Sequence, residues 1–360
     1  MNRLEQLQAT GVSIWLDTLS RDLLEEGEFE RLQQELAVTG ATSNPTIFSK
    51  AIVGSDRYDE QLVSLLEAGV TDPHEHFLEL ALEDVRGAAK TLEYAHRKSG
   101  GSDGFVSLEV TPDLAYDTAA TVAQARDLWQ QLDAPNVMIK VPATEAGLPA
   151  IEELTAAGVN VNVTLLFSVG RYEQVIEAYL RGLERRVQAG QPIAGIRSVA
   201  SFFVSRVDAK ADARLSADSP FKGRVGTANA LTAYDTYRDA FAGDRWQRLR
   251  DLGATPQRPL WASTAPKDSS YRDVLYLESL ALPGSILTGA DPGRIRGPRG
   301  AATCGRDFRD GRRRSTRDHG RARAGGVDAF CAAYRELLGS IKERAQALRA
   351  DAGRLPALSR

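Results

Sequence analysis

Short β-rich runs alternate with longer helical patterns along most of this chain, and this order most restricts the folds open to it. The runs are rich in β-branched and aromatic residues, and the stretches between them repeat apolar residues at three- and four-residue spacings. The predicted strands are Val12–Asp17, Val38–Ser43, Phe105–Thr111, Val137–Val141, Val159–Phe167, Ser198–Phe203, Leu260–Ser263 and Ser285–Thr288. The predicted helices are Arg21–Leu36, Arg57–Ala68, His74–His96, Thr118–Leu132, Leu148–Ala157, Val169–Ala189 and Gly226–Phe241. Repeated βα units of this kind predict one α/β domain, a (β/α)8 barrel.

The alternative fold is an open, doubly wound sheet. Its nucleotide-binding version carries a Gly-x-Gly-x-x-Gly turn after a strand, and none of the predicted strands is followed by one. The 360 residues are 42% hydrophobic and 26% charged, which is typical of a globular domain with a full-sized core. A single barrel of this length is common.

Charge, cysteines and hydropathy restrict the partners and the compartment. The net charge of −3 gives no reason to expect a nucleic acid or a membrane as partner. Two cysteines cannot form a disulfide framework, which favours a reducing compartment. The start of the chain is helical and charged without the apolar core of a signal peptide, and no apolar run is long enough to span a membrane. We expect a cytoplasmic enzyme, either a monomer or a homodimer.

One segment departs from the barrel pattern. Asp291–Gly325 holds eleven Arg and four Asp but no Lys or Glu, and it cannot build a buried face. We therefore predict a barrel over 1–288, an irregular, disordered Arg/Gly-rich segment over 289–326 and a C-terminal helix over 327–350 that packs on the barrel. A local shift of the reading frame would give the same kind of segment. A polyanion-binding tract is a further reading, although no aromatic residues are interleaved for stacking.

Lys140 lies in a run, Val137–Val141, that otherwise reads as a buried strand. An ammonium group there is costly unless it is paired or loses its proton. A neutral amine is a nucleophile toward carbonyl carbons, so one hypothesis is a lysine that forms a Schiff base. The other is a lysine at a strand end that reaches water.

Side chains alternate between the two faces of a strand, which sorts the polar residues. Val137, Ile139 and Val141 share one face, and Met138 and Lys140 share the other. On the fifth strand, Val159, Val161, Val163 and Leu165 oppose Asn160, Asn162 and Thr164. The same alternation turns five polar groups toward the barrel interior near the carboxyl ends of four strands: Asp17, Glu109, Lys140, Asn162 and Thr164. Barrel enzymes place their chemistry at that end.

Each of these residues also has a purely structural interpretation. Asp17 could cap the following helix, Glu109 and Lys140 could form an ion pair that only fixes packing, and Asn162 and Thr164 could satisfy each other. Arg206, with Ser201 shortly before it, follows the sixth strand in a pattern that suits a phosphate ester. The alternative there is a surface arginine paired with Asp208.

Six stretches together resemble transaldolase, in its longer bacterial form, over roughly residues 1 to 288. They are Trp15–Ser20, Gly40–Thr46, Ser107–Val110, Asn136–Thr144, Asn162–Ser168 and Ser201–Arg206. The resemblance implies a Schiff-base mechanism that needs no metal or organic cofactor. Lys140 would bind the ketone carbon of a ketose phosphate, Asp17 would take the C4 hydroxyl proton, and Glu109 and Thr164 would move protons through a water. Asn44 and Asn162 would hold the substrate, and Ser201 and Arg206 would hold its phosphate.

The implied reaction is transfer of a dihydroxyacetone unit between sugar phosphates. The substrates would be sedoheptulose 7-phosphate or fructose 6-phosphate with glyceraldehyde 3-phosphate or erythrose 4-phosphate, in the non-oxidative pentose phosphate pathway. An aldolase that releases free dihydroxyacetone and a degenerate barrel that binds polyanions are the alternatives. In one departure from the family pattern, Leu231 is expected where a second basic residue often meets the phosphate.

Overall fold

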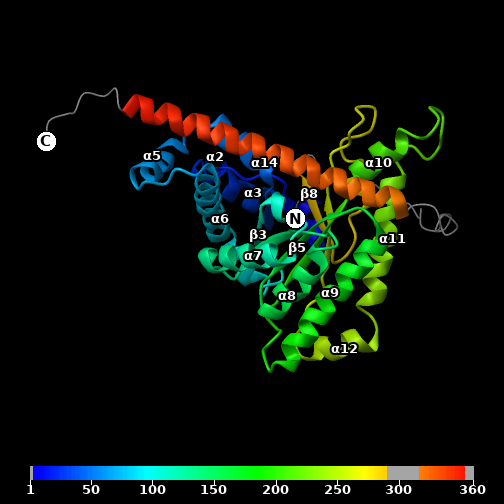
Figure 1. Ribbon diagram of the computed structural model, residues 1–360. Coiled ribbons are helices and arrows are strands. Elements are labelled where there is room, and N and C mark those ends of the chain that lie inside the picture. Colours follow the sequence, from blue (N-terminus) through cyan, green and yellow to red (C-terminus); the bar gives the residue numbers. More distant parts are fainter. Residues whose placement is uncertain (1–2, 290–315, 353–360) are drawn as a thin grey trace.

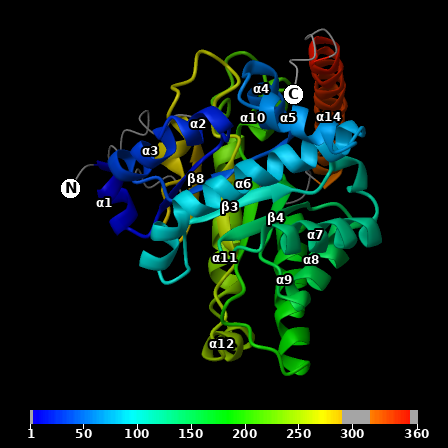
Figure 2. The ribbon, with the colours of Figure 1, turned by 90° about the vertical axis from the view of Figure 1, so that its left-hand side faces the viewer.

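Eight parallel strands close into a barrel, in the order in which they occur along the chain. The computed structural model describes residues 3–289 and 316–352. The strands are β1 (Ser13–Leu16), β2 (Gly40–Thr42), β3 (Phe105–Glu109), β4 (Val137–Pro142), β5 (Val161–Leu166), β6 (Ser198–Phe203), β7 (Arg258–Ala262) and β8 (Ile286–Gly289). The predicted (β/α)8 barrel is confirmed, and helices surround the strands in the two views of Figures 1 and 2.

More helices surround the barrel than the sequence pattern predicted. Before β6 lie α1 (Arg3–Ala9), α2 (Arg21–Glu25), α3 (Glu28–Leu36), α4 (Pro45–Gly54), α5 (Asp59–Glu67), α6 (Pro73–Lys98), the 3₁₀ turn η1 (Pro112–Leu114), α7 (Thr118–Leu132), α8 (Gly147–Ala157) and α9 (Val169–Gln188). After β6 lie α10 (Ser205–Asp212), α11 (Val225–Ala240), α12 (Asp244–Asp251), α13 (Leu275–Ser279) and α14 (Thr316–Ala352). The helix predicted over 21–36 is two helices, because the chain turns at Gly27 with φ of 71°.

The helix α14 crosses the molecule in Figure 1 from beside α10 and α11 to beyond α5. It contacts α4, α5, α6, η1 and β5. It begins at Thr316, before the predicted start at 327; Arg and Ala in residues 316–326 favour a helix, whereas the three Gly there oppose one. Of the segment predicted as irregular (289–326), the structure describes Gly289, at the end of β8, and residues 316–326, in α14. The rest of that segment lies outside the described residues.

The alternation predicted for the strands is present in the packing. Val137, Ile139 and Val141 belong to the main core between the barrel and its helices. Met138 belongs to a second cluster, which consists of Trp15, Phe105, Met138, Val199, Leu260 and Ile286 and fills the barrel interior. These six side chains form an apolar plug inside the barrel. On each strand, the side chain two residues farther along points to the same interior and therefore lies above this plug, at the carboxyl end of the strands.

Leu165 breaks the alternation of β5. The pairing of β5 with β6 shifts register between Val163 and Leu166, and Leu165 has φ of 59°, in the left-handed region. Leu165 therefore leaves the face that it was predicted to share with Val163. It packs instead in a third cluster, the mouth cluster, which consists of Ala115, Leu165, Phe167, Phe203, Val207, Val327 and Phe330.

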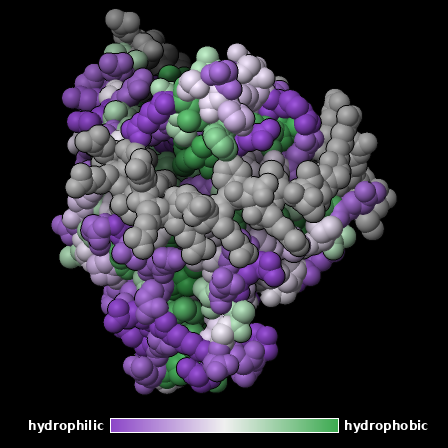
Figure 3. Space-filling view, turned by 90° about the vertical axis from the view of Figure 1, so that its right-hand side faces the viewer, coloured by the Kyte–Doolittle hydropathy of each residue, from purple (hydrophilic) through white to green (hydrophobic). Residues whose placement is uncertain are grey.

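The surface seen in Figure 3 shows hydrophobic residues in narrow strips between hydrophilic ones. The large hydrophobic side chains exposed on the described residues come from separate elements: Val53, Tyr94, Tyr116, Phe221 and Leu252. Within the described ranges, no helix is both long and apolar enough to cross a membrane.

A buried carboxylate ties the strands together at the opposite, amino-terminal end of the barrel. Asp103 is only 9% exposed and accepts hydrogen bonds from Trp15 Nε1 at 2.9 Å and from Thr39 Oγ1 at 2.7 Å. It also accepts from the hydroxyl of Ser13. Because a polar group that loses its partner in a buried place is costly, this network stabilises the barrel far from its chemistry.

We predict that Asp103→Ala lowers the free energy of unfolding by about 3 kcal/mol, because it leaves several buried donors without an acceptor. The control is Asp239→Ala on the exposed side of α11, which should change the same quantity by less than about 0.5 kcal/mol. Urea unfolding followed by circular dichroism measures both. Equal effects of the two substitutions would contradict the role given to Asp103.

Candidate active site

Lys140 and Glu109 form a buried ion pair at the carboxyl ends of two neighbouring strands. They are register partners on β4 and β3, and Lys140 Nζ lies 3.2 Å from Glu109 Oε2. Lys140 Nζ also donates to the carbonyl oxygen of Ser43 at 3.0 Å. Burial raises the pKa of Glu109, and the charges of Lys140 and Arg206 offset part of that rise. Glu109 is therefore a stronger base than an exposed glutamate and lies within reach of the Lys140 proton.

Asn162 continues the same row on β5, as the register partner of Lys140. Its Nδ2 donates to Ser107 Oγ at 2.9 Å, and its Oδ1 accepts from Ser201 Oγ at 2.7 Å. Thr164 is fully buried, and its Oγ1 has no hydrogen-bond partner among the described residues. The interpretation that Asn162 and Thr164 satisfy each other is therefore wrong.

Asp17 follows β1 directly and so lies at the same carboxyl end of the barrel as Lys140 and Glu109. Burial raises its pKa, while the positive charges of Lys140, Lys267 and Arg206 act to lower it. The residue that caps α2 is Ser20, whose hydroxyl accepts from Leu23 N, so a capping role does not account for Asp17. Two carboxylates, Asp17 and Glu109, thus share the mouth of the barrel with cationic side chains.

Arg206 lies in the first turn of α10 and is half-buried. Burial lowers the pKa of its guanidinium, and the charges of Asp17 and Glu109 oppose that effect. Asp208 is buried and accepts from Gly226 N at 2.6 Å, so it is committed to the start of α11. The alternative in which Asp208 pairs with Arg206 is wrong.

Lys267 is a charged residue of the site that the sequence reasoning missed. It is exposed in the loop after β7, where partial desolvation and the charge of Arg206 lower its pKa and Asp17 opposes them. Leu231, expected at the place of a second cation, packs from α11 against the main core. The cation that accompanies Arg206 at the mouth therefore comes from the β7 loop. The sequence offered one hint, because Lys267 lies only a few residues beyond the predicted strand Leu260–Ser263. The prediction considered only side chains that alternate along the strands, and Lys267 is not on a strand.

Asn44 is the N-cap of α4, and its Oδ1 accepts from Ile47 N at 3.0 Å. The amide NH₂ group of its side chain is left to donate to a ligand. Asn44 also borders a small cavity of about 10 Å³ that Glu109 and Tyr334 line as well. This cavity has room for about one water molecule.

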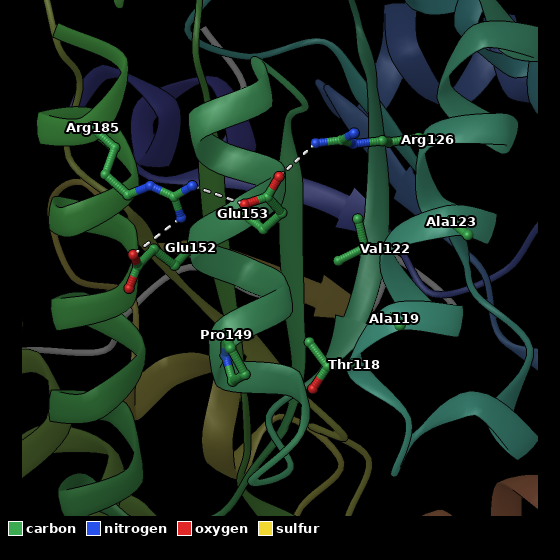
Figure 4. A pocket seen from close by; sticks show the side chains of 9 residues that line it. All are labelled: Thr118, Ala119, Val122, Ala123, Arg126, Pro149, Glu152, Glu153 and Arg185. Atoms are coloured by element: carbon green, nitrogen blue, oxygen red, sulfur yellow. Dashed lines mark hydrogen bonds and ion pairs between the residues drawn. The ribbon is translucent and has the colours of Figure 1, made fainter. Parts of the chain in front are cut away.

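A separate groove of about 630 Å³ lies on the outer wall between α7 and α8 (Figure 4). Its charged side chains pair with one another, since Arg126 lies 2.7 Å from Glu153, and Arg185 lies 2.9 Å from Glu153 and 3.2 Å from Glu152. These groups are therefore engaged already, and the groove holds none of the mouth residues.

The mouth residues together suit covalent chemistry on a carbonyl compound. The amine of Lys140 can act as a nucleophile once Glu109 takes its proton, and Asp17 is a second carboxylate for proton transfer. Arg206 and Lys267 supply positive charge for an anionic group on the substrate. Within the described part of the chain, no three His, Cys, Asp or Glu side chains gather in a way that could hold a metal ion.

The sequence of this chain matches the model of one known protein family. The model of the family Transaldolase/Fructose-6-phosphate aldolase matches residues 14–292, which include all of the mouth residues except those of α14. The match covers more than half of the chain.

Curated relatives carry related names. The chain is 44% identical over 376 aligned positions to a Transaldolase from Acidothermus cellulolyticus, which covers 98% of this chain and 99% of that protein. It is 50% identical over 307 positions to Transaldolase 1 from Streptomyces coelicolor, with 82% and 80% covered. It is 47% identical over 291 positions to a Transaldolase from Mycobacterium ulcerans, with 79% and 78% covered.

We predict that Lys267→Met raises the pKa of Asp17 further, because one of the three cations that lower it is lost. Lys267→Arg, which keeps the charge, should leave that pKa close to its value in the unmodified protein. Carbon-13 NMR of the aspartate carboxyl groups, with Asp17→Asn to assign the signal, measures the titration. An Asp17 titration that is the same in both variants would show that Lys267 lies too far away to act on this carboxylate.

Proposed function

This chain belongs to the transaldolase/fructose-6-phosphate aldolase family, and we propose that it is a transaldolase that transfers dihydroxyacetone units through a Schiff base on Lys140. The donor is a ketose phosphate, such as sedoheptulose 7-phosphate or fructose 6-phosphate. The acceptor is an aldose phosphate, such as glyceraldehyde 3-phosphate or erythrose 4-phosphate. The observation that carries this proposal is the 3.2 Å contact of a buried Lys140 amine with the Glu109 carboxylate.

Formation of the Schiff base begins with proton transfer from Lys140 to Glu109. The burial-raised pKa of Glu109 favours this transfer, and the Ser43 carbonyl holds the amine in place. The neutral amine attacks the C2 carbonyl carbon, and the resulting carbinolamine loses its hydroxyl as water to give a protonated imine. Thr164, whose hydroxyl has no other partner within the described residues, orients the water through which Glu109 returns the proton.

Cleavage of the C3–C4 bond follows on the imine. Asp17 takes the proton of the C4 hydroxyl as the C4 carbonyl forms, and the electron pair of the broken bond moves into the imine to give an enamine. The aldose phosphate leaves, and the three-carbon unit stays bound to Lys140. The second half of the reaction is the reverse of these steps with another aldose phosphate, and Asp17 returns its proton.

Hydroxyl groups of the bound sugar are held by the amide side chains. The hydrogen bonds to Ser107 and Ser201 fix the orientation of the Asn162 amide beside Lys140. The amide NH₂ of Asn44 adds a donor. The hydroxyl hydrogen of Ser201 is used for Asn162, and phosphate oxygens at neutral pH chiefly accept, so we assign Ser201 to the intermediate rather than to the phosphate.

Arg206 and Lys267 bind the phosphate of the sugar. The two cations follow the neighbouring strands β6 and β7, and a phosphate dianion bound by both would relieve their mutual repulsion, which adds to desolvation in lowering the pKa of Lys267. We further propose a cytoplasmic protein of the non-oxidative pentose phosphate pathway, monomeric or homodimeric. The free thiol of Cys331 supports the cytoplasmic location. The scattered positions of the exposed hydrophobic residues support a monomer or a homodimer.

Transfer is distinguished from simple cleavage by the fate of the three-carbon unit. With fructose 6-phosphate alone, we expect little free dihydroxyacetone, because the enamine remains on Lys140. With erythrose 4-phosphate added, sedoheptulose 7-phosphate and glyceraldehyde 3-phosphate should form together. Lys140→Met should lower the rate by more than about 10³-fold, since the nucleophile is lost.

Chromatography coupled to mass spectrometry quantifies the products. Free dihydroxyacetone as the main product in both mixtures would identify the protein as an aldolase and refute the transferase. A protein with neither activity that binds nucleic acid in a salt-sensitive way would support the polyanion-binding alternative.

A further inference from the structure

The guanidinium of Arg206 lies close to two aromatic rings. Its central carbon is 5.1 Å from the centre of the Phe203 ring and 5.7 Å from the centre of the Phe330 ring. Phe203 is the last residue of β6 and lies close to Arg206 in sequence, whereas Phe330 lies on α14. The residue that binds the phosphate is therefore in contact with the far end of the chain.

Phe330 has a fixed place in the mouth cluster. It is only 4% exposed and packs with Val327, also on α14, against residues at the ends of β5 and β6. The register shift of β5 turns Leu165 into this cluster, and Leu165 Cδ2 lies close to the backbone at Gly326. The ring of Phe330 is thus held by the barrel rather than by Arg206.

The geometry leaves the guanidinium ready for an anion. A guanidinium offers its hydrogens in its own plane and its faces to aromatic rings, so ring contacts do not use up its donors. Arg206 makes no ion pair or hydrogen bond with another of the described residues, although the charges of Asp17 and Glu109 act on it. The rings therefore restrict the rotation of a long side chain whose in-plane donors stay available.

We propose that Phe330 is a positioning residue that holds Arg206 in the orientation that binds the substrate phosphate. The proposal rests on the proposed function in that Arg206 is taken as a phosphate ligand. It makes α14 part of the binding site, because the helix supplies one of the two rings that confine Arg206. Phe330 itself does not touch the substrate.

Other contacts of α14 allow the ring to be tested without releasing the helix. Tyr334 packs against Phe77 with ring centres 5.4 Å apart, and its hydroxyl lies 2.5 Å from His74 Nδ1. Arg344 forms an ion pair with Asp59 and donates to the carbonyl oxygen of Ile52 at 3.1 Å. These contacts remain when Phe330 is changed.

The test compares Phe330→Leu with Phe330→Tyr, which keeps the ring, and with Arg344→Met, which removes the ion pair of α14 with Asp59 fourteen residues farther along the helix. We expect Phe330→Leu to weaken binding of inorganic phosphate by about fivefold, and Phe330→Tyr to restore most of it. Arg344→Met should leave phosphate binding close to that of the unmodified protein. Titration followed by phosphorus-31 NMR measures the dissociation constant without reference to any reaction.

Kinetics separate positioning from a general loss of structure. In Phe330→Leu, the KM for erythrose 4-phosphate should rise by about the same factor, while the KM for unphosphorylated erythrose and the kcat stay nearly unchanged. Phosphate binding that is unchanged in Phe330→Leu, or weakened equally in Arg344→Met, would overturn the proposal. If leucine prevents folding, Phe330→Met provides the same comparison. A protein that binds phosphate as expected but catalyses no transfer would refute the proposed function and leave the role of Phe330 intact.

Discussion

The contact between Lys140 and Glu109 is the interaction on which the rest of the site depends. Both side chains are removed from water, and burying two charges is favourable only when they meet closely and find further partners. Here the Ser43 carbonyl is that further partner, and the apolar plug below keeps water from the base of the pair. The arrangement gives an amine a neighbouring base instead of bulk solvent, which is the condition for a nucleophile at neutral pH.

Closure of the barrel brings the other groups to this pair. The register of β3, β4 and β5 sets Glu109, Lys140 and Asn162 side by side, and β1 and the β7 loop bring Asp17 and Lys267 from the other side of the mouth. A shift of one residue in any of these strands would turn its polar group out into the main core. The asparagine and serine network fixes one wall of the site, and the rings around Arg206 fix another.

The alternation of strands and helices along the chain predicted the barrel, and the alternation of side chains along each strand predicted most of its mouth. It worked for Met138 and Lys140 because a regular strand has a strict period of two. It failed at Leu165, where a register shift and a left-handed backbone interrupt that period. It could not find Lys267, which lies on a loop, or Phe330, whose contact with Arg206 joins distant parts of the chain. Leu231 was misjudged because a resemblance in sequence does not specify which way a helix faces.

Reduction with borohydride in the presence of fructose 6-phosphate tests the central claim most directly. Borohydride converts an imine into a stable amine, so the trapped sugar fragment marks the lysine that formed it. Peptide mass mapping should find the adduct on Lys140, only when substrate is present, and should find none on Lys267 at the same mouth. No adduct on any lysine, or an adduct on Lys267 in place of Lys140, would contradict the account.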